Sequence, residues 1–111
     1  MLAVVMFGLS AVGGLVFATK HLKGQPPSIG VGLIHGLLGA TGLLSLIWYV
    51  MHNAVVPRLN WSLGLFVVVA LGGFGLFGAK LMKKPIPRPL LVIHALGAVT
   101  AYLLLLSVAF F

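Results

Sequence analysis

The sequence contains no aspartate, no glutamate and no cysteine. Without carboxylates it has no acid pair for glycoside hydrolysis, no Ser-His-Asp triad and no acidic cage for Mg²⁺ or Ca²⁺. Without cysteine it has no disulfide, no thiolate zinc site, no iron–sulfur ligation and no cysteine nucleophile. These absences favour a protein without catalytic activity of its own.

Charge is also scarce. Charged residues make up 6% of the 111 residues, against about 25% in an ordinary soluble domain. Hydrophobic residues make up 61%, the mean hydropathy is +1.24 and seven Lys and Arg residues give a formal charge of +7. The composition predicts an integral membrane protein that lies in a lipid bilayer. The few basic residues stand between apolar runs, so we interpret them as topology signals and expect no nucleic-acid partner.

Four apolar runs fill the chain, and about 20 apolar residues are needed for one helix to cross a bilayer. The segments between them, KHLKGQPPS, HNAVVPRLN and LMKKPIPR, contain the Pro, Gly and basic residues typical of helix ends. We therefore predict an all-α integral membrane protein with one four-helix transmembrane domain, residues 1–111. The predicted spans are about 2–19, 29–51, 61–80 and 89–111.

The basic residues are divided unequally between the loops. Arg58 alone lies in the second loop, and the first and third loops share one side of the bilayer. The positive-inside rule predicts that these two loops are cytoplasmic and both termini outside, as in a bacterial inner membrane. There the cations would meet anionic lipid headgroups. The residues concerned are Lys20, Lys23, Lys80, Lys83, Lys84 and Arg88.

The two halves of the chain resemble each other. Residues 11–27 match residues 70–87 with one insertion, and residues 33–42 match residues 92–101. The similarity predicts two repeated helical hairpins, about 1–52 and 61–111, related by a pseudo-twofold axis along the membrane normal. The matched pairs include Ala11 with Ala70, Gly13 with Gly72, Gly14 with Gly73, Phe17 with Phe77, Lys20 with Lys80, His35 with His94 and Thr41 with Thr100.

Two histidines lie inside the spans at matching depth. His35 follows Ser28 by seven residues, about 10 Å along a helix at 1.5 Å per residue, and His94 follows Arg88 by six. Ionisable groups within a bilayer are costly and usually mark a function. Because haem iron accepts two axial histidines, the pair predicts one haem b bound as a metal complex between His35 and His94.

The surroundings of this pair suggest how a porphyrin would be held. Gly13, Gly14, Gly72 and Gly73 fall in the same layer and would make room for the ring, as would Gly39, one turn after His35. The haem propionates need cations, and Lys20, Lys80 and Arg88 lie at the nearer membrane face. The first hypothesis is therefore a small b-type cytochrome-like protein that carries electrons to or from a quinone or another redox partner.

Other interpretations stay open. Small residues and buried histidines also serve simple helix packing, with Thr41 and Thr100 available as hydrogen-bond partners. The second hypothesis is a non-catalytic accessory or structural subunit of a larger membrane complex, or a homo-oligomer. The third is a small transporter in which His35 and His94 carry protons.

Overall fold

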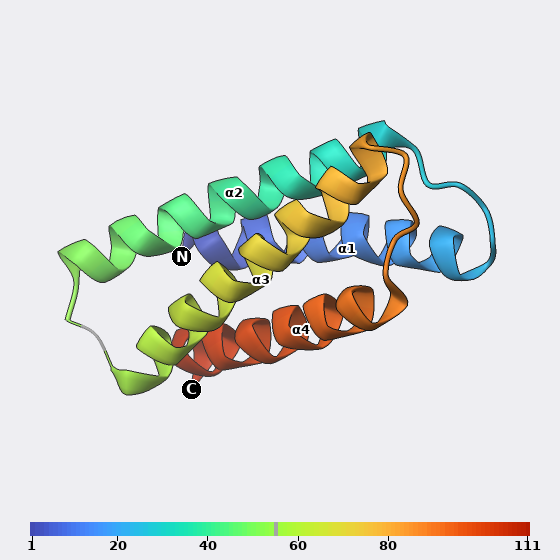
Figure 1. Ribbon diagram of the computed structural model, residues 1–111. Coiled ribbons are helices and arrows are strands. Elements are labelled where there is room, and N and C mark those ends of the chain that lie inside the picture. Colours follow the sequence, from blue (N-terminus) through green and yellow to red (C-terminus); the bar gives the residue numbers. More distant parts are fainter. Residues whose placement is uncertain (55) are drawn as a thin grey trace.

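The computed structural model describes residues 1–54 and 56–111, and these residues form four helices (Figure 1). Along the chain they are α1 (Leu2–Leu22), α2 (Ile29–His52), α3 (Pro57–Leu81) and α4 (Arg88–Phe110). Each helix is long and apolar enough to cross a membrane, which confirms the predicted all-α architecture of four helices of membrane-spanning length. Val55, in the predicted second loop, lies outside the described residues.

Six of the eight helix ends differ from the predicted spans, by one to four residues, and three of these differences involve Lys20, Pro57 and Arg88. Helix α1 continues to Leu22, so Lys20 lies in its last turn, where a cation interacts favourably with the helix carbonyls. Helix α3 begins at Pro57, four residues before the predicted start, because proline fits the first turn, where its missing N–H has no helical partner. Arg88 is the first residue of α4 and not part of the loop.

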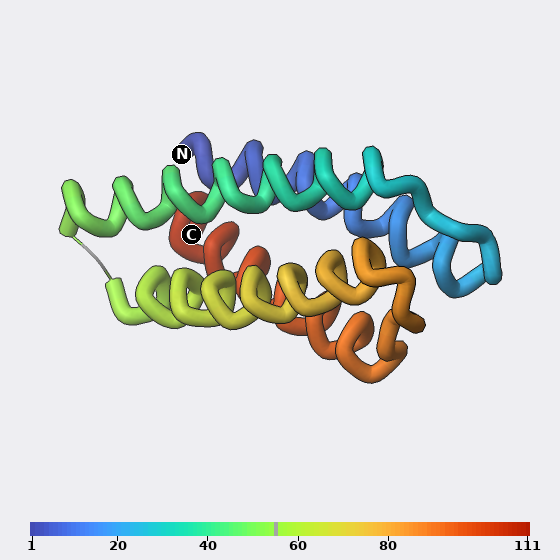
Figure 2. Tube along the Cα trace, turned by 45° about the horizontal axis from the view of Figure 1, so that its top comes forward, coloured from blue at the N-terminus to red at the C-terminus, as the bar shows by residue number. Residues whose placement is uncertain are grey.

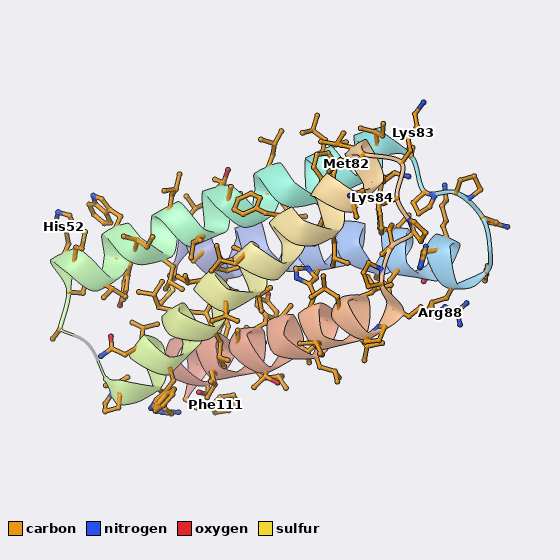
Figure 3. The ribbon with its side chains drawn as sticks, in the orientation of Figure 1. His52, Met82, Lys83, Lys84, Arg88 and Phe111 are labelled. Atoms are coloured by element: carbon orange, nitrogen blue, oxygen red, sulfur yellow. The ribbon has the colours of Figure 1, made fainter. Side chains whose placement is uncertain are left out.

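The four helices pack in a ring. Among the described residues, α1 and α3 each contact both α2 and α4, so α2 and α4 lie diagonally across the bundle. Both chain termini lie at one end of the bundle, together with the last turn of α2 and the first turn of α3 (Figures 1 and 2). We call this the terminal end, and the opposite end, which carries the α1–α2 and α3–α4 loops, the basic end. Figure 3 shows Lys83, Lys84 and Arg88 at the basic end.

Buried side chains gather in the half of the bundle near the terminal end. Here Phe7 and Phe66 stack with parallel rings whose centroids are 3.7 Å apart. Ser62 is fully buried and donates a hydrogen bond of 2.8 Å to the carbonyl of Ala101. In the basic half, Leu76 and Leu91 are the buried residues within the described helices. The hydrophobic core comprises Ala3, Phe7, Leu46, Leu59, Phe66, Ala101 and Leu105.

The two loops at the basic end start with the same turn. After α1, Gly24 has a φ of 73°, and the Gln25 N–H donates to the Lys20 carbonyl at 2.9 Å. After α3, Lys83 has a φ of 56°, and the Lys84 N–H donates to the Ala79 carbonyl at 2.9 Å. Each turn satisfies carbonyls that the end of a helix would otherwise leave unpaired.

Candidate functional site

The bundle brings His35 and His94 together from the diagonal helices α2 and α4. Their ring centroids are 6.1 Å apart, and the ring planes are inclined at 80°. Both side chains are half-buried. The sequence predicts that the two histidines lie at matching depth, and in the structure their imidazoles are direct neighbours at the centre of the bundle.

Backbone carbonyls fix the protonation of both rings. The Nδ1 atom of His35 lies 2.6 Å from the carbonyl oxygen of Ser10, and that of His94 lies 2.9 Å from the carbonyl oxygen of Val69. A carbonyl oxygen only accepts hydrogen bonds, so Nδ1 is the donor in each ring. When Nδ1 of a neutral imidazole carries the proton, Nε2 keeps its lone pair. Each ring therefore offers Nε2 as a base or metal ligand.

Ser10 gives His35 a contact that His94 lacks. Its hydroxyl donates to the His35 carbonyl at 2.9 Å, and Oγ lies 3.1 Å from His35 Nδ1. The Nδ1 proton of His35 is thus shared between the carbonyl and the hydroxyl of Ser10. Val69, the residue beside His94, has no hydroxyl. Sequence reasoning missed Ser10, although a polar residue just before the Gly13-Gly14 pair in an apolar span was an available signal.

The glycine pairs accommodate the imidazoles themselves. A Cβ atom at Gly14 would lie 2.8 Å from Cε1 of His35, and one at Gly73 would lie 3.0 Å from Cε1 of His94. The neighbouring glycines are less crowded: a Cβ at Gly13 would be 3.4 Å from His35 Cβ, and one at Gly72 would be 3.7 Å from His94 Nδ1. The space expected for a porphyrin beside these glycines is taken up by the two histidine rings.

Side chains also fill the small face that follows His35 on α2. A Cβ at Gly39 would lie 3.3 Å from Ser10 Oγ, and one at Gly42 would lie 3.0 Å from the Phe7 ring. Gly39 therefore contacts Ser10 and leaves no open space on the side of the terminal end. A planar ligand on the imidazoles would have to extend into the basic half, which has fewer buried side chains.

Lys20, Lys80 and Arg88 are the cations predicted to hold the propionates, and of these Lys80 on α3 extends toward α1 of the other hairpin. Its Nζ lies 5.8 Å from the centroid of the Phe17 ring on α1, a cation–π contact. Phe17 and Phe77 both approach Gly32 on α2, so two aromatic rings lie against α2 at this level of the basic half. Lys20 and Arg88 are exposed, and the structure does not bring them to the imidazoles.

The other two histidines lie apart from this pair. The His52 ring stacks on Trp48 at the terminal end, with centroids 4.3 Å apart, and its Nδ1 donates to the Trp48 carbonyl at 2.7 Å. His21 lies in the last turn of α1. In the part of the chain that the structure describes, no three metal-ligating His, Cys, Asp or Glu side chains cluster.

Comparisons with protein-family models, with curated proteins and with solved structures find no match for this chain. A functional assignment therefore depends on the chemistry of the histidine pair.

Proposed function

We propose that the protein is a small membrane electron-transfer protein of the b-type cytochrome kind, with one haem b ligated by His35 and His94. A metal–imidazole bond is about 2 Å long and a ring centroid lies about 1 Å beyond the nitrogen, so two imidazoles on opposite sides of one metal have centroids about 6 Å apart. The observed separation of 6.1 Å, together with hydrogen bonds that put the proton of each ring on Nδ1 and leave Nε2 as the ligating nitrogen, is the observation that carries the proposal.

The polar groups around the pair suit a ligated metal. A metal-ligating histidine usually donates its other N–H to a carbonyl or carboxylate, which fixes the ring and raises the basicity of the ligating nitrogen. The Ser10 and Val69 carbonyls accept these bonds. Lys80, which lies against Phe17 between the hairpins, would neutralise a propionate.

Haem supplies reversible one-electron oxidation and reduction of its iron. The chain's own part is to orient the two imidazoles and to surround them with apolar side chains, which together tune the reduction potential. The partner that exchanges electrons would be a quinone in the bilayer or a second redox protein.

The proposal includes an internal repeat about a pseudo-twofold axis. A single offset of 59 residues relates the stacked Phe7 and Phe66, the left-handed Gly24 and Lys83, and His35 and His94. These equivalences support a repeat with one constant offset. The match between residues 11–27 and 70–87 in the sequence, by contrast, needs one insertion. In this register Lys20 corresponds to Ala79 and not to Lys80, so the two lysines would have separate roles.

We also propose that the basic end is cytoplasmic, and that both termini lie outside. The support is the charge distribution: six of the seven Lys and Arg residues belong to the two hairpin loops or the helix turns beside them. The positive-inside rule relates this distribution to orientation, as in a bacterial inner membrane.

An accessory or structural subunit is the second candidate, and three glycines favour it. A Cβ atom at Gly36, Gly64 or Gly78 would have no neighbour within 4 Å in the described chain. Small residues with open space beside them on membrane helices allow another helix to approach closely, either from a second copy or from a larger complex. In this case the protein would assemble unchanged after both His35 and His94 are replaced.

The test is an absorption spectrum of the purified protein from cells supplied with haem, recorded after air oxidation and after dithionite reduction. We expect about one haem per chain and an α band that sharpens on reduction. His35→Ala and His94→Ala should each abolish it, because each removes one of the two imidazoles that would hold the haem. His52→Ala is the matched control and should leave the spectrum unchanged.

A folded protein with a featureless visible spectrum would contradict the cytochrome proposal. Equal haem content in the wild type and the double variant His35→Ala/His94→Ala would contradict the assigned ligands. Circular dichroism of each variant establishes whether the helices are retained.

A further inference from the structure

A groove of about 390 Å³ runs along α1 near the basic end. Its apolar part is formed by Leu15 and Val16, which lie deeper in the predicted span. Its polar part is formed one turn later by Thr19 and Lys20, and then by Lys23 and Gln25 from the loop. All six residues are exposed, so the groove opens toward the surroundings of the bundle.

Backbone hydrogen bonds hold the polar part of the groove in place. The Lys23 N–H donates to the Thr19 carbonyl at 3.1 Å, and the Gln25 N–H donates to the Lys20 carbonyl at 2.9 Å. Gly24, with a φ of 73°, allows the chain to fold back over the end of the helix. Lys23 and Gln25 are therefore anchored beside Lys20 and do not extend freely from the loop.

The charge of the groove has no compensation within the protein. The chain has no carboxylate side chain, so neither Lys20 nor Lys23 has an acidic side chain to pair with. An anion from outside has to neutralise them. The order along α1, apolar then hydroxyl then ammonium, matches the order of acyl chain, glycerol and phosphate in a phospholipid that lies parallel to the helix.

We propose that this groove is a binding site for one anionic phospholipid. The phosphate lies between Lys20 and Lys23, Gln25 and Thr19 hydrogen-bond the headgroup and glycerol oxygens, and an acyl chain covers Leu15 and Val16. Basic clusters at the membrane surface attract anionic lipids in this way. The site is independent of haem binding and goes beyond the proposed electron transfer.

The second hairpin offers a natural contrast. At positions 59 residues further along, α3 and its loop carry Gly78, Ala79 and Met82 in place of Thr19, Lys20 and Lys23. The cations of the second loop, Lys83 and Lys84, are neighbours in sequence and lie beyond the helix end. The lipid site is thus predicted for the first hairpin specifically, although the second hairpin carries more cations at this end.

Native mass spectrometry of the full chain in mild detergent tests the proposal, with phosphatidylglycerol and phosphatidylcholine as probes. The wild type should bind its first phosphatidylglycerol at least tenfold more tightly than phosphatidylcholine. A lysine placed against the lipid phosphate contributes about fivefold, so Lys20→Gln/Lys23→Gln, which removes both lysines of the groove, should weaken phosphatidylglycerol binding about 25-fold. The matched control Lys83→Gln/Lys84→Gln removes the same charge and should change it less than threefold.

Three results would overturn the site. Equal losses in the two double variants would mean diffuse attraction between a basic protein and an anionic lipid. Equal binding of the two lipids by the wild type would mean no headgroup recognition. Displacement of the lipid by an equal concentration of glycerol phosphate would mean a site for a soluble phosphate, in which the apolar part of the groove has no role.

Discussion

The two hairpins hold their histidines in the same way but surround them differently. In each hairpin, Nδ1 of the histidine bonds to the carbonyl of a residue 25 positions earlier, and a glycine faces its Cε1 atom. The backbone and the glycine therefore set the position of the ring. The neighbouring side chain, Ser10 or Val69, sets its polar environment. The shared carbonyl and glycine thus place each imidazole in the bundle, and the Ser10 or Val69 side chain makes the two imidazoles different.

The largest expected effect tests the shared part of this arrangement. Gly14→Leu and Gly73→Leu should each displace the adjacent imidazole, because a Cβ at either site lies within 3.0 Å of Cε1. We expect each to cost about 3 kcal/mol of unfolding free energy, the upper part of the usual range for overpacking. Gly14→Leu should be the more destabilising of the two, since a Cβ at Gly14 lies only 2.8 Å from Cε1 of His35.

Thermal unfolding in detergent, followed by circular dichroism, measures both effects. Gly36→Leu is the matched control, because a Cβ at Gly36 has no neighbour within 4 Å. Similar losses at Gly14, Gly73 and Gly36 would mean that the glycines are needed for something other than the histidines.

A smaller effect tests the difference between the hairpins. Ser10→Val gives His35 the environment of His94 and removes the hydroxyl bond to the His35 carbonyl, at a cost of about 1 kcal/mol. The Ser10 backbone carbonyl remains, so both rings should keep the proton on Nδ1. Imidazole ¹⁵N NMR measures this tautomer directly. A switch of His35 to the Nε2–H form in Ser10→Val would mean that the hydroxyl, and not the carbonyl, holds the ring.

The smallest effect concerns the turns at the basic end. Lys83 adopts the left-handed conformation that Gly24 adopts in the first hairpin, and a side chain is unfavourable there. We expect Lys83→Gly to stabilise the protein by about 0.5–1 kcal/mol and Gly24→Ala to destabilise it by a similar amount. Lys84→Gly removes the same charge without this gain. Equal effects of Lys83→Gly and Lys84→Gly in thermal unfolding would contradict the conformational explanation.

The fold was predictable because hydropathy and span length determine the number of membrane helices. The ends of the helices were harder to predict. Pro57 permits α3 to begin before Trp61, and a hydropathy average carries no information about this. Residue spacing also put His35, His94 and the glycine pairs in one layer. It could not show that Gly14 and Gly73 face the imidazoles, because the rotation of each helix about its axis is set by packing.

Side-chain direction was likewise hidden from the sequence. Lys20, Lys80 and Arg88 were equivalent candidates on charge and depth, yet only Lys80 packs on an aromatic ring of the other hairpin. Ser10 was overlooked because its role depends on a partner 25 residues away. Both features follow from contacts between helices, which no local pattern encodes.

The central claim is that His35 and His94 share one iron, and electron paramagnetic resonance of the oxidised, haem-loaded protein tests it most directly. Two imidazole ligands predict a low-spin ferric signal in the wild type. They also predict conversion to a high-spin signal, or loss of haem, in His94→Ala and equally in His35→Ala. A wild-type signal that is high-spin, or a low-spin signal that survives in either variant, would contradict the account.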